Sequence, residues 1–291
     1  MKARANGIEL EYESFGNPAD PTILLIMGLG AQLTLWPLPL VEALVERGFH
    51  VVRYDNRDVG LSTKLDHARP PRIGMLVLQR LLRLRPRVPY TLGDMAADAA
   101  GLLDALGIEK AHIVGASMGG MIAQIFAATY PDRTLSLTSI MSTTGNPRLS
   151  RASREAMDVL VNRPKTDDLE ALVAHGVRAS QVLAGPAFPV APDVLEARVR
   201  ETIQRSNYPD GFARQLAAIV ADGDRRQRLK AITAPTVVIH GSDDSLVPLD
   251  GGRDTAASIP GARLVEVRGM GHNVPVEVIP QIVDAIESIA L

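Results

Sequence analysis

The sequence predicts an α/β fold in which a mostly parallel sheet of about eight strands is flanked by helices and interrupted by a helical insertion. Short apolar runs alternate with helical segments in the first half of the chain, which is typical of a parallel sheet with helices on both faces. This alternation stops near residue 144, where helical stretches broken by Pro and Gly follow, and it resumes after residue 231. We therefore expect residues 1–144 and 232–291 to form the core domain and residues 145–231 to form a helical cap.

The expected strands are short, mainly apolar segments, of which Thr22–Met27 is continuously apolar, except the first, which alternates apolar and polar residues as a half-exposed strand does. They are Ile8–Phe15, Thr22–Met27, His50–Tyr54, Ala111–Val114, Leu135–Met141, Thr236–Gly241 and Ala262–Val267. The expected helices are Leu38–Gly48, Thr91–Leu106, a helix that starts at Met118, one at about 250–258, and one from Pro275 to about Ile289. Thr91 and Asp94 have the spacing of a capping box, and Gly107 provides the stop signal for the same helix.

Residues 75–85 form a basic amphipathic segment that has two interpretations. In the first, it is a short helix whose apolar face packs on the body of the protein or lines the entrance of the site. In the second, its apolar face contacts a membrane surface or a second subunit. We favour packing as a short helix.

The composition limits the class of protein. The chain has 291 residues, 46% hydrophobic and 22% charged, which suits one large globular domain or one domain with an insertion. A formal net charge of −2 gives no general attraction to nucleic acid, and the absence of cysteine excludes disulfides and thiol catalysis. The histidines lack the spacing of metal ligands, and we expect neither a metal nor another cofactor.

The N-terminal residues lack the apolar core of a signal peptide, and the apolar run Ile23–Met27 is far too short to span a bilayer. We therefore expect a cytoplasmic protein without stable membrane insertion, either a monomer or a homodimer.

Gly115-Ala116-Ser117-Met118-Gly119-Gly120 is the stretch with the clearest chemical meaning. It lies between an apolar strand and an apolar helix, so Ser117 stands at the apex of a strand–turn–helix unit that matches the G-x-S-x-G pattern. Glycines two residues before and after the serine remove the Cβ atoms that would crowd such a bend. A serine in this position is a candidate nucleophile, and the alternative is an ordinary glycine-rich turn.

A serine nucleophile needs a base, and His272 is the best candidate among the six histidines. It follows the last expected strand in the loop Arg268–Pro275, at the carboxyl edge of the sheet that also carries Ser117. His240 also ends a strand on that edge, but it belongs to an apolar run and is expected to be buried. His50 and His112 begin strands and should lie at the opposite edge.

The base in turn needs a carboxylate, and Asp243 and Asp244 both follow the His240 strand at the same edge. The residues alone leave the two alternatives open, with the other aspartate acting in the turn. The developing oxyanion needs two N–H donors. Met118, the residue after the serine, is expected to supply one, and the loop Gly28-Leu29-Gly30 the other.

Together these motifs resemble the α/β-hydrolase superfamily over essentially the whole chain. Ser117 matches the serine of G-x-S-x-G-G, and His272 matches the histidine of G-x-G-H. The pattern H-G-x-x-D-x-x-x-P is met by His240–Pro248, and this resemblance implies that the acid is Asp244. The stretch Asp55–Ser62 is similar to D-x-R-x-x-G-x-S, in a version that resembles the aclacinomycin methylesterase-like branch, which implies hydrolysis of a carboxylic ester.

The chain departs from the family pattern before the oxyanion glycine, where many members have histidine and this sequence has Met27. The donor is a backbone N–H, so Leu29 can still supply it, but a polar side chain that stiffens the loop is missing. Apolar and aromatic residues near the catalytic loops or in the insertion are candidates for the substrate pocket. They are Trp36, Met118, Val247, Met157, Leu160, Phe188, Tyr208 and Phe212. Each of those in the insertion is more typical of core packing within the cap, whereas Trp36, Met118 and Val247 lie near the catalytic loops and are the better candidates.

The sequence therefore predicts a serine esterase that acts on a small-molecule ester through an acyl-enzyme intermediate. The same triad would also serve a lactonase, a hydrolase of C–C bonds or a perhydrolase, because these differ in pocket shape. A hydrolase-like small-molecule receptor is an alternative from another class.

Overall fold

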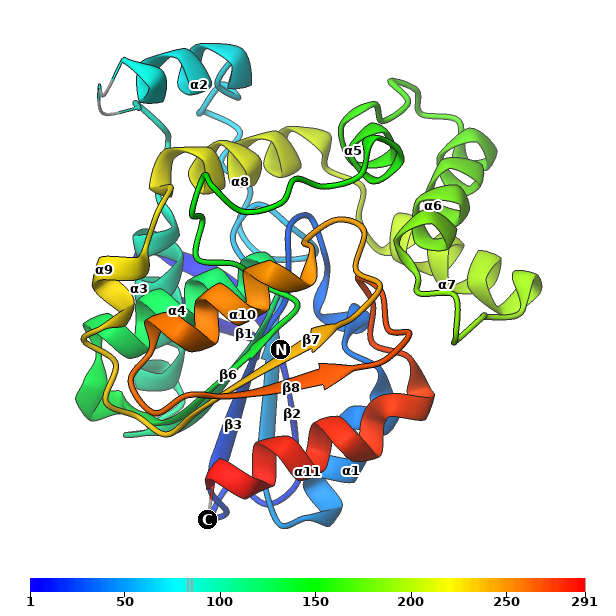
Figure 1. The fold of residues 1–291 in the computed structure, drawn as a ribbon. Helices are drawn as coiled ribbons and strands as arrows, with labels where there is room; N and C mark the ends of the chain where they lie inside the picture. The colour runs from blue at the N-terminus through cyan, green and yellow to red at the C-terminus, as the bar shows by residue number, and fades with distance from the viewer. Residues whose placement is uncertain (83, 85, 291) are drawn as a thin grey trace.

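The computed structural model describes residues 1–82, 84 and 86–290, and it is built around one eight-stranded sheet with helices on both faces (Figure 1). The strand order is β1-β2-β4-β3-β5-β6-β7-β8, in which β1 and β2 are antiparallel to their neighbours and all the other pairs are parallel. The predicted fold class is confirmed.

The strands agree with the expected segments apart from the first. They are β1 (Lys2–Ala5), β2 (Ile8–Phe15), β3 (Thr22–Ile26), β4 (His50–Tyr54), β5 (Ala111–Ala116), β6 (Thr134–Ile140), β7 (Thr236–Gly241) and β8 (Arg263–Val267). The central strands β3, β4, β5 and β7 are buried at every residue, as their apolar runs require. Strand β1 had not been predicted.

Two hydrophobic clusters hold the layers together, one on each face of the sheet. The helices of one face are α3 (Leu92–Ala105), α4 (Met118–Thr129), α9 (Arg226–Leu229) and α10 (Leu249–Ser258). Those of the other face are α1 (Leu38–Glu46) and α11 (Ile279–Ala290). Short 3₁₀ turns occur at Leu33–Leu35, Pro131–Arg133 and Val276–Val278.

The predicted capping box is present at the start of α3. The Thr91 side chain accepts a hydrogen bond from the Asp94 backbone N–H, and the Asp94 side chain accepts one from the Thr91 N–H. Gly107, with φ +69°, follows the end of the helix, because a left-handed residue costs least when it has no Cβ.

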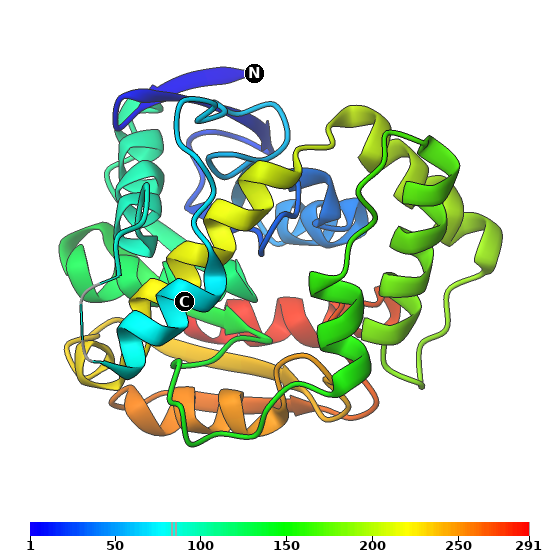
Figure 2. The same cartoon turned by 90° about the horizontal axis from the view of Figure 1, so that it is seen from above.

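Between β6 and β7 the chain is helical. The segments are α5 (Arg154–Val161), α6 (Leu169–Leu183), α7 (Pro192–Arg205), α8 (Pro209–Asp222) and the short α9. Helix α6 packs against both α5 and α7, whereas α8 packs on α2 and α3 and, seen from above, crosses over the core (Figure 2). We refer to residues 145–231 as the helical insertion.

Helix α2 (Ile73–Leu81) covers the first part of the predicted amphipathic segment, whose residues 83 and 85 lie outside the described part of the chain. Leu76 is buried, and Arg80 Nη1 donates a 2.9 Å hydrogen bond to the Ala221 carbonyl at the end of α8. Met75 and Leu78 are exposed, so α2 packs on α8 with only part of its apolar surface. No helix in the described ranges combines the length and the apolar character needed to cross a bilayer.

Candidate active site

Ser117 lies between β5 and α4 in a strained backbone conformation, with φ 56° and ψ −120°. The strain persists because the surroundings fix it: Ser117 N–H donates to the Ile140 carbonyl at 2.9 Å, and Ser142 Oγ donates to the Ser117 carbonyl at 2.8 Å. A Cβ on Gly115 would lie 2.1 Å from the Gly119 carbonyl oxygen, and one on Gly119 would lie 1.9 Å from the Ile26 oxygen. Both glycines are therefore required by the close approach of backbones.

His272 and Asp244 lie next to this serine. His272 Nε2 is 2.9 Å from Ser117 Oγ, and His272 Nδ1 is 2.7 Å from Asp244 Oδ2. A carboxylate can only accept, so Nδ1 carries the proton and Nε2 is left to accept the serine hydroxyl proton. The other Asp244 oxygen accepts the N–H groups of Leu246 at 2.9 Å and Val247 at 2.7 Å, which fixes the carboxylate in place.

The two aspartates occupy different environments. Asp244 is buried, whereas Asp243 is exposed and accepts the Gly269 N–H at 3.1 Å. His240 is buried, as expected, and its Nε2 lies 2.7 Å from the Val247 carbonyl and 3.6 Å from Asp244 Oδ2. Burial lowers the pKa of His240 and so favours its neutral ring, which contacts the loop Ser242–Val247 through the Val247 carbonyl.

The loop after β3 lies against the serine. A Cβ on Gly28 would be 3.1 Å from Ser117 Cβ, so the residue before Leu29 packs directly against the serine. In the part of the chain that the structure describes, neither Leu29 N–H nor Met118 N–H donates a hydrogen bond. Both are available as the N–H donors expected from the sequence.

The helical insertion directly contacts the loop Arg268–Pro275, which contains His272. His272 N–H donates a 2.7 Å hydrogen bond to the Leu183 carbonyl at the end of α6. A Cβ on Gly271 would lie 2.3 Å from Gly185 N, and one on Gly185 would lie 2.0 Å from the Gly269 oxygen. The glycines of this loop therefore permit close packing of the insertion on it.

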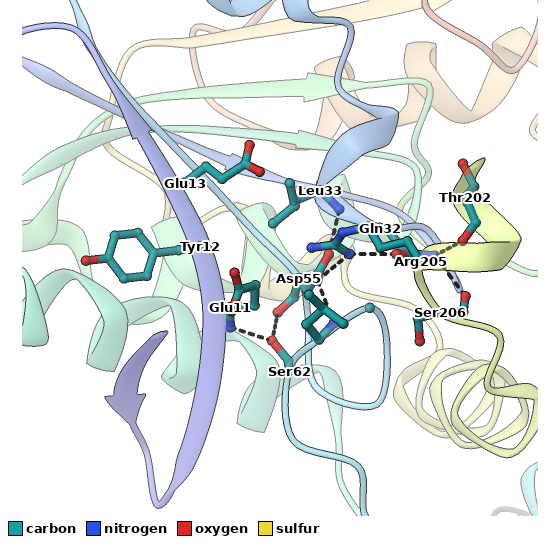
Figure 3. A network of polar contacts seen from close by, with 12 residues as sticks. Glu11, Tyr12, Glu13, Gln32, Leu33, Asp55, Ser62, Thr202, Arg205 and Ser206 are labelled. Atoms are coloured by element: carbon teal, nitrogen blue, oxygen red, sulfur yellow. Dashed lines mark hydrogen bonds and ion pairs between the residues drawn. The ribbon is translucent and has the colours of Figure 1, made fainter. Parts of the chain in front are cut away.

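A buried polar network joins the insertion to the loops that follow β3 and β4 (Figure 3). Asp55, which is fully buried, accepts Leu33 N–H at 2.7 Å and Leu61 N–H at 2.8 Å. Arg205 of α7 donates from Nη1 to Asp55 Oδ2 at 2.8 Å and to Gln32 Oε1 at 2.6 Å. The Gln32 amide donates in turn to the carbonyls of Thr202 and Ser206.

The expected pocket residues lie in several places. Trp36 is fully buried in the cluster that contains α1 and α11, and Phe188 packs at the edge of the same cluster. Val247 lines an open cavity of about 410 Å³ beside the acid loop. Met157 is 44% exposed on α5. Their contact with a substrate stays a prediction.

Phe212 and Tyr208 lie at the start of α8. The Phe212 ring covers Gly30, where an added Cβ would be 2.6 Å from Cδ2, and the Arg163 guanidinium lies 4.5 Å from the ring centroid. Tyr208 O–H donates to Asp66 at 2.5 Å and accepts from Arg214 at 2.8 Å, so its hydroxyl belongs to a polar cluster. Of these two aromatic residues, Phe212 is therefore the one that contacts the loop Gly28–Gly30 after β3.

The sequence did not predict the polar residues by which the insertion contacts the core, the buried Arg214 and Gln215 and the partly buried Arg205. A local signal was absent because their partners are more than 100 residues away in the sequence, at separations of 150, 156 and 185 residues. The Asp55–Ser62 motif contains a partner of each of them: Asp55 for Arg205, Asp58 for Arg214 and the Arg57 carbonyl for Gln215.

Comparison with known proteins identifies the family. The sequence profile of the α/β hydrolase fold family matches residues 21–277. The chain is 30% identical to rhodomycin D methylesterase of Streptomyces peucetius and 31% identical to that of Streptomyces sp. (strain C5), in each case over 93% of this chain and 91% of the relative. The crystal structure of the enol-lactonase from Burkholderia xenovorans LB400 is similar with a TM-score of 0.73, at 27% identity over 99% of both chains. The chain therefore belongs to the α/β hydrolase fold family, among the methylesterase-like carboxylic ester hydrolases that its motifs resemble.

Proposed function

We propose that the protein is a serine hydrolase that cleaves carboxylic esters through an acyl-enzyme intermediate, with Ser117 as nucleophile, His272 as base and Asp244 as acid. The observation that carries this proposal is the continuous chain of contacts from Ser117 Oγ to His272 Nε2 at 2.9 Å and from His272 Nδ1 to Asp244 Oδ2 at 2.7 Å. These are the distances and roles that activate a serine hydroxyl.

In the first half of the proposed reaction, Ser117 Oγ attacks the ester carbonyl carbon while its proton moves to His272 Nε2. The N–H groups of Leu29 and Met118 stabilise the oxyanion that develops. The tetrahedral intermediate then collapses, the C–O bond to the alcohol breaks, and His272 gives its proton to the leaving alcohol. In the second half, His272 takes a proton from water as the water oxygen attacks the acyl carbonyl carbon. The bond from this carbon to Ser117 Oγ then breaks and His272 returns the proton to Oγ, which releases the carboxylic acid and free Ser117.

We also propose that residues 145–231 serve as a cap over this site. The hydrogen bond from His272 N–H to Leu183 and the contact of Phe212 with Gly30 support this role, because both bring the insertion to the catalytic loops. Methyl esters are the first substrates to test, since two relatives at 30% and 31% identity are named methylesterases. Lactones are the second candidate, because a lactone is an internal ester and the enol-lactonase structure aligns with 99% of this chain.

A panel of p-nitrophenyl acetate and butyrate, methyl esters, lactones and β-diketones, assayed with wild type and Ser117→Ala, tests the function. We expect ester turnover that falls by about 10³-fold or more in Ser117→Ala. Preference for lactones or for cleavage of a diketone C–C bond would replace the ester assignment while keeping the triad. Binding of these compounds without turnover in the wild type would instead indicate a receptor.

A further inference from the structure

Among the residues that the structure describes, Gln215 in α8 is the one side chain of the helical insertion that hydrogen-bonds to the backbone of Gly28–Gly30, which we call the oxyanion loop. Its Oε1 accepts the Gly30 N–H at 2.8 Å, and its Nε2 donates to the Arg57 carbonyl at 2.7 Å. A backbone N–H can only donate and a carbonyl can only accept, so these partners determine the orientation of the amide. Gln215 has no exposed surface, which means that water cannot replace either hydrogen bond.

The position of Leu29 N–H depends on the peptide groups around it. Gly30 N–H belongs to the peptide that follows Leu29, so the contact with Gln215 fixes one side of this residue. On the other side, the Gly28 carbonyl accepts Ala31 N–H at 3.2 Å, which holds the peptide that contains Leu29 N–H. Asn56 Nδ2 donates to the Met27 carbonyl at 2.8 Å and completes the support.

The loop needs support from other segments because, within the described residues, its own side chains form no polar contact that would stiffen it. Met27 stands where a polar side chain was expected, and Gly28 and Gly30 are conformationally free, with Gly30 at φ +64°. One hydrogen bond within the loop, Asn56 of the loop after β4 and Gln215 of α8 therefore share the task, and of the three only Gln215 lies outside the sheet domain.

We propose that Gln215 is a positioning residue that aligns the Leu29 N–H with the oxyanion, so that the docking of α8 on the core is required for full chemical rate. The inference rests on the proposed ester-hydrolase function. The N–H of Leu29 stabilises the transition state and contributes little to the binding of the neutral ester. Loss of Gln215 should consequently lower kcat with little change in KM.

The test compares Gln215→Met with a chemically matched control, Gln124→Met. Gln124 in α4 is also fully buried, and its amide likewise donates to one partner, Ser139, and accepts from another, Arg225. Removing one oxyanion donor typically costs about 10²–10³ in kcat, so a displaced donor should cost about 10–100-fold. We expect this loss in Gln215→Met, with KM within about threefold, and a much smaller loss of kcat in Gln124→Met at comparable destabilisation.

Amide hydrogen exchange gives a readout that is independent of turnover. The segment 27–33 should exchange faster in Gln215→Met than in wild type and should be unchanged in Gln124→Met, because only the first variant frees Gly30 N–H. Equal exchange of this segment in wild type and Gln215→Met, or equal loss of kcat in the two variants, would overturn the inference. A wild type without ester turnover would refute the proposed function instead, and hydrogen exchange would still decide whether Gln215 positions the loop.

Discussion

The sheet core and the helical insertion are held in place by different forces. Helix α4 of the core buries most of its residues, mainly apolar ones, whereas α6 buries only Val173 and α7 has no buried residue among those described. Polar contacts attach the insertion to the core: the buried Arg214 and Gln215 contact Asp58 and Gly30, and the partly buried Arg205 contacts Asp55. Hydrophobic packing thus stabilises the core around the site, and directed hydrogen bonds hold the insertion against it.

The largest expected effect separates the two aspartates of the core. Asp244→Asn should lower kcat by up to ~10⁴-fold, because an amide at this position can hold His272 in the wrong tautomer. Asp243→Asn should lower kcat by about tenfold at most, since the Asp243 side chain is exposed and its hydrogen bonds in the described structure come from the Gly269 N–H and the Ser242 hydroxyl. Steady-state kinetics on both folded variants measures the difference. A reversed ranking would move the acid to Asp243.

The two histidines at the acid loop give the next comparison. His272→Ala should lower kcat by about 10³-fold or more, because it removes the base. His240→Gln keeps an amide donor near the Val247 carbonyl, which His240 Nε2 contacts at 2.7 Å, so we expect a loss of less than about tenfold, together with reduced stability. If His272→Ala retained near-wild-type turnover, the base would have to be reassigned to His240.

The polar attachment of the insertion is tested by stability. Arg214 donates to both Asp58 oxygens at 2.8 and 3.0 Å, and both side chains are buried. Arg214→Met should lower the free energy of unfolding by about 3–5 kcal/mol, because it leaves the Asp58 charge buried without its partner. Arg200→Met, which removes exposed ion pairs with Glu170 and Glu196, should lower the free energy of unfolding far less, because exposed pairs are screened by water. Similar losses in urea unfolding would show that the buried pair has no special role.

The smallest expected effect is the pH dependence of this attachment. Burial alone would raise the pKa of the Asp58 carboxyl, but hydrogen bonds from Arg214 and from the Leu65 N–H hold that pKa below its ordinary value. The carboxylate therefore adds stability that is fully present above the unfolded pKa of about 3.9 and is lost as the pH falls toward the lower folded pKa. Asp58→Asn should flatten the loss of unfolding free energy between about pH 5 and 3. An unchanged slope would mean that other carboxylates account for it.

The sequence predicted those features that local chemistry determines. The glycines around Ser117, the capping box at Thr91 and the loops after β7 and β8 each carry their signal within a few residues. Strand β1 was missed although Asn6-Gly7, with φ of 48° and 81°, is a strong signal for a hairpin turn. Its short, exposed strand gave no apolar pattern to accompany the turn.

The attachment of the insertion lacked any such local signal. Glutamine and arginine are ordinary residues on a helix, and nothing near Gln215 in the sequence distinguishes it from an exposed position. Its burial follows from a partner 185 residues away, so only the three-dimensional arrangement identifies it. The contacts that couple the insertion to the chemistry are therefore the part of the site that the sequence could not predict.

Ser117 is proposed to carry the acyl group during turnover, and mass spectrometry of the intact protein tests this role most directly. Wild type quenched in acid during turnover of p-nitrophenyl butyrate should show one added butyryl group, located by digestion on the peptide that contains Ser117. Ser117→Ala should show no adduct under the same conditions. Turnover that depends on the folded enzyme but leaves no acyl group on Ser117 when deacylation is limiting, or a butyryl adduct that persists in Ser117→Ala, would contradict the mechanism.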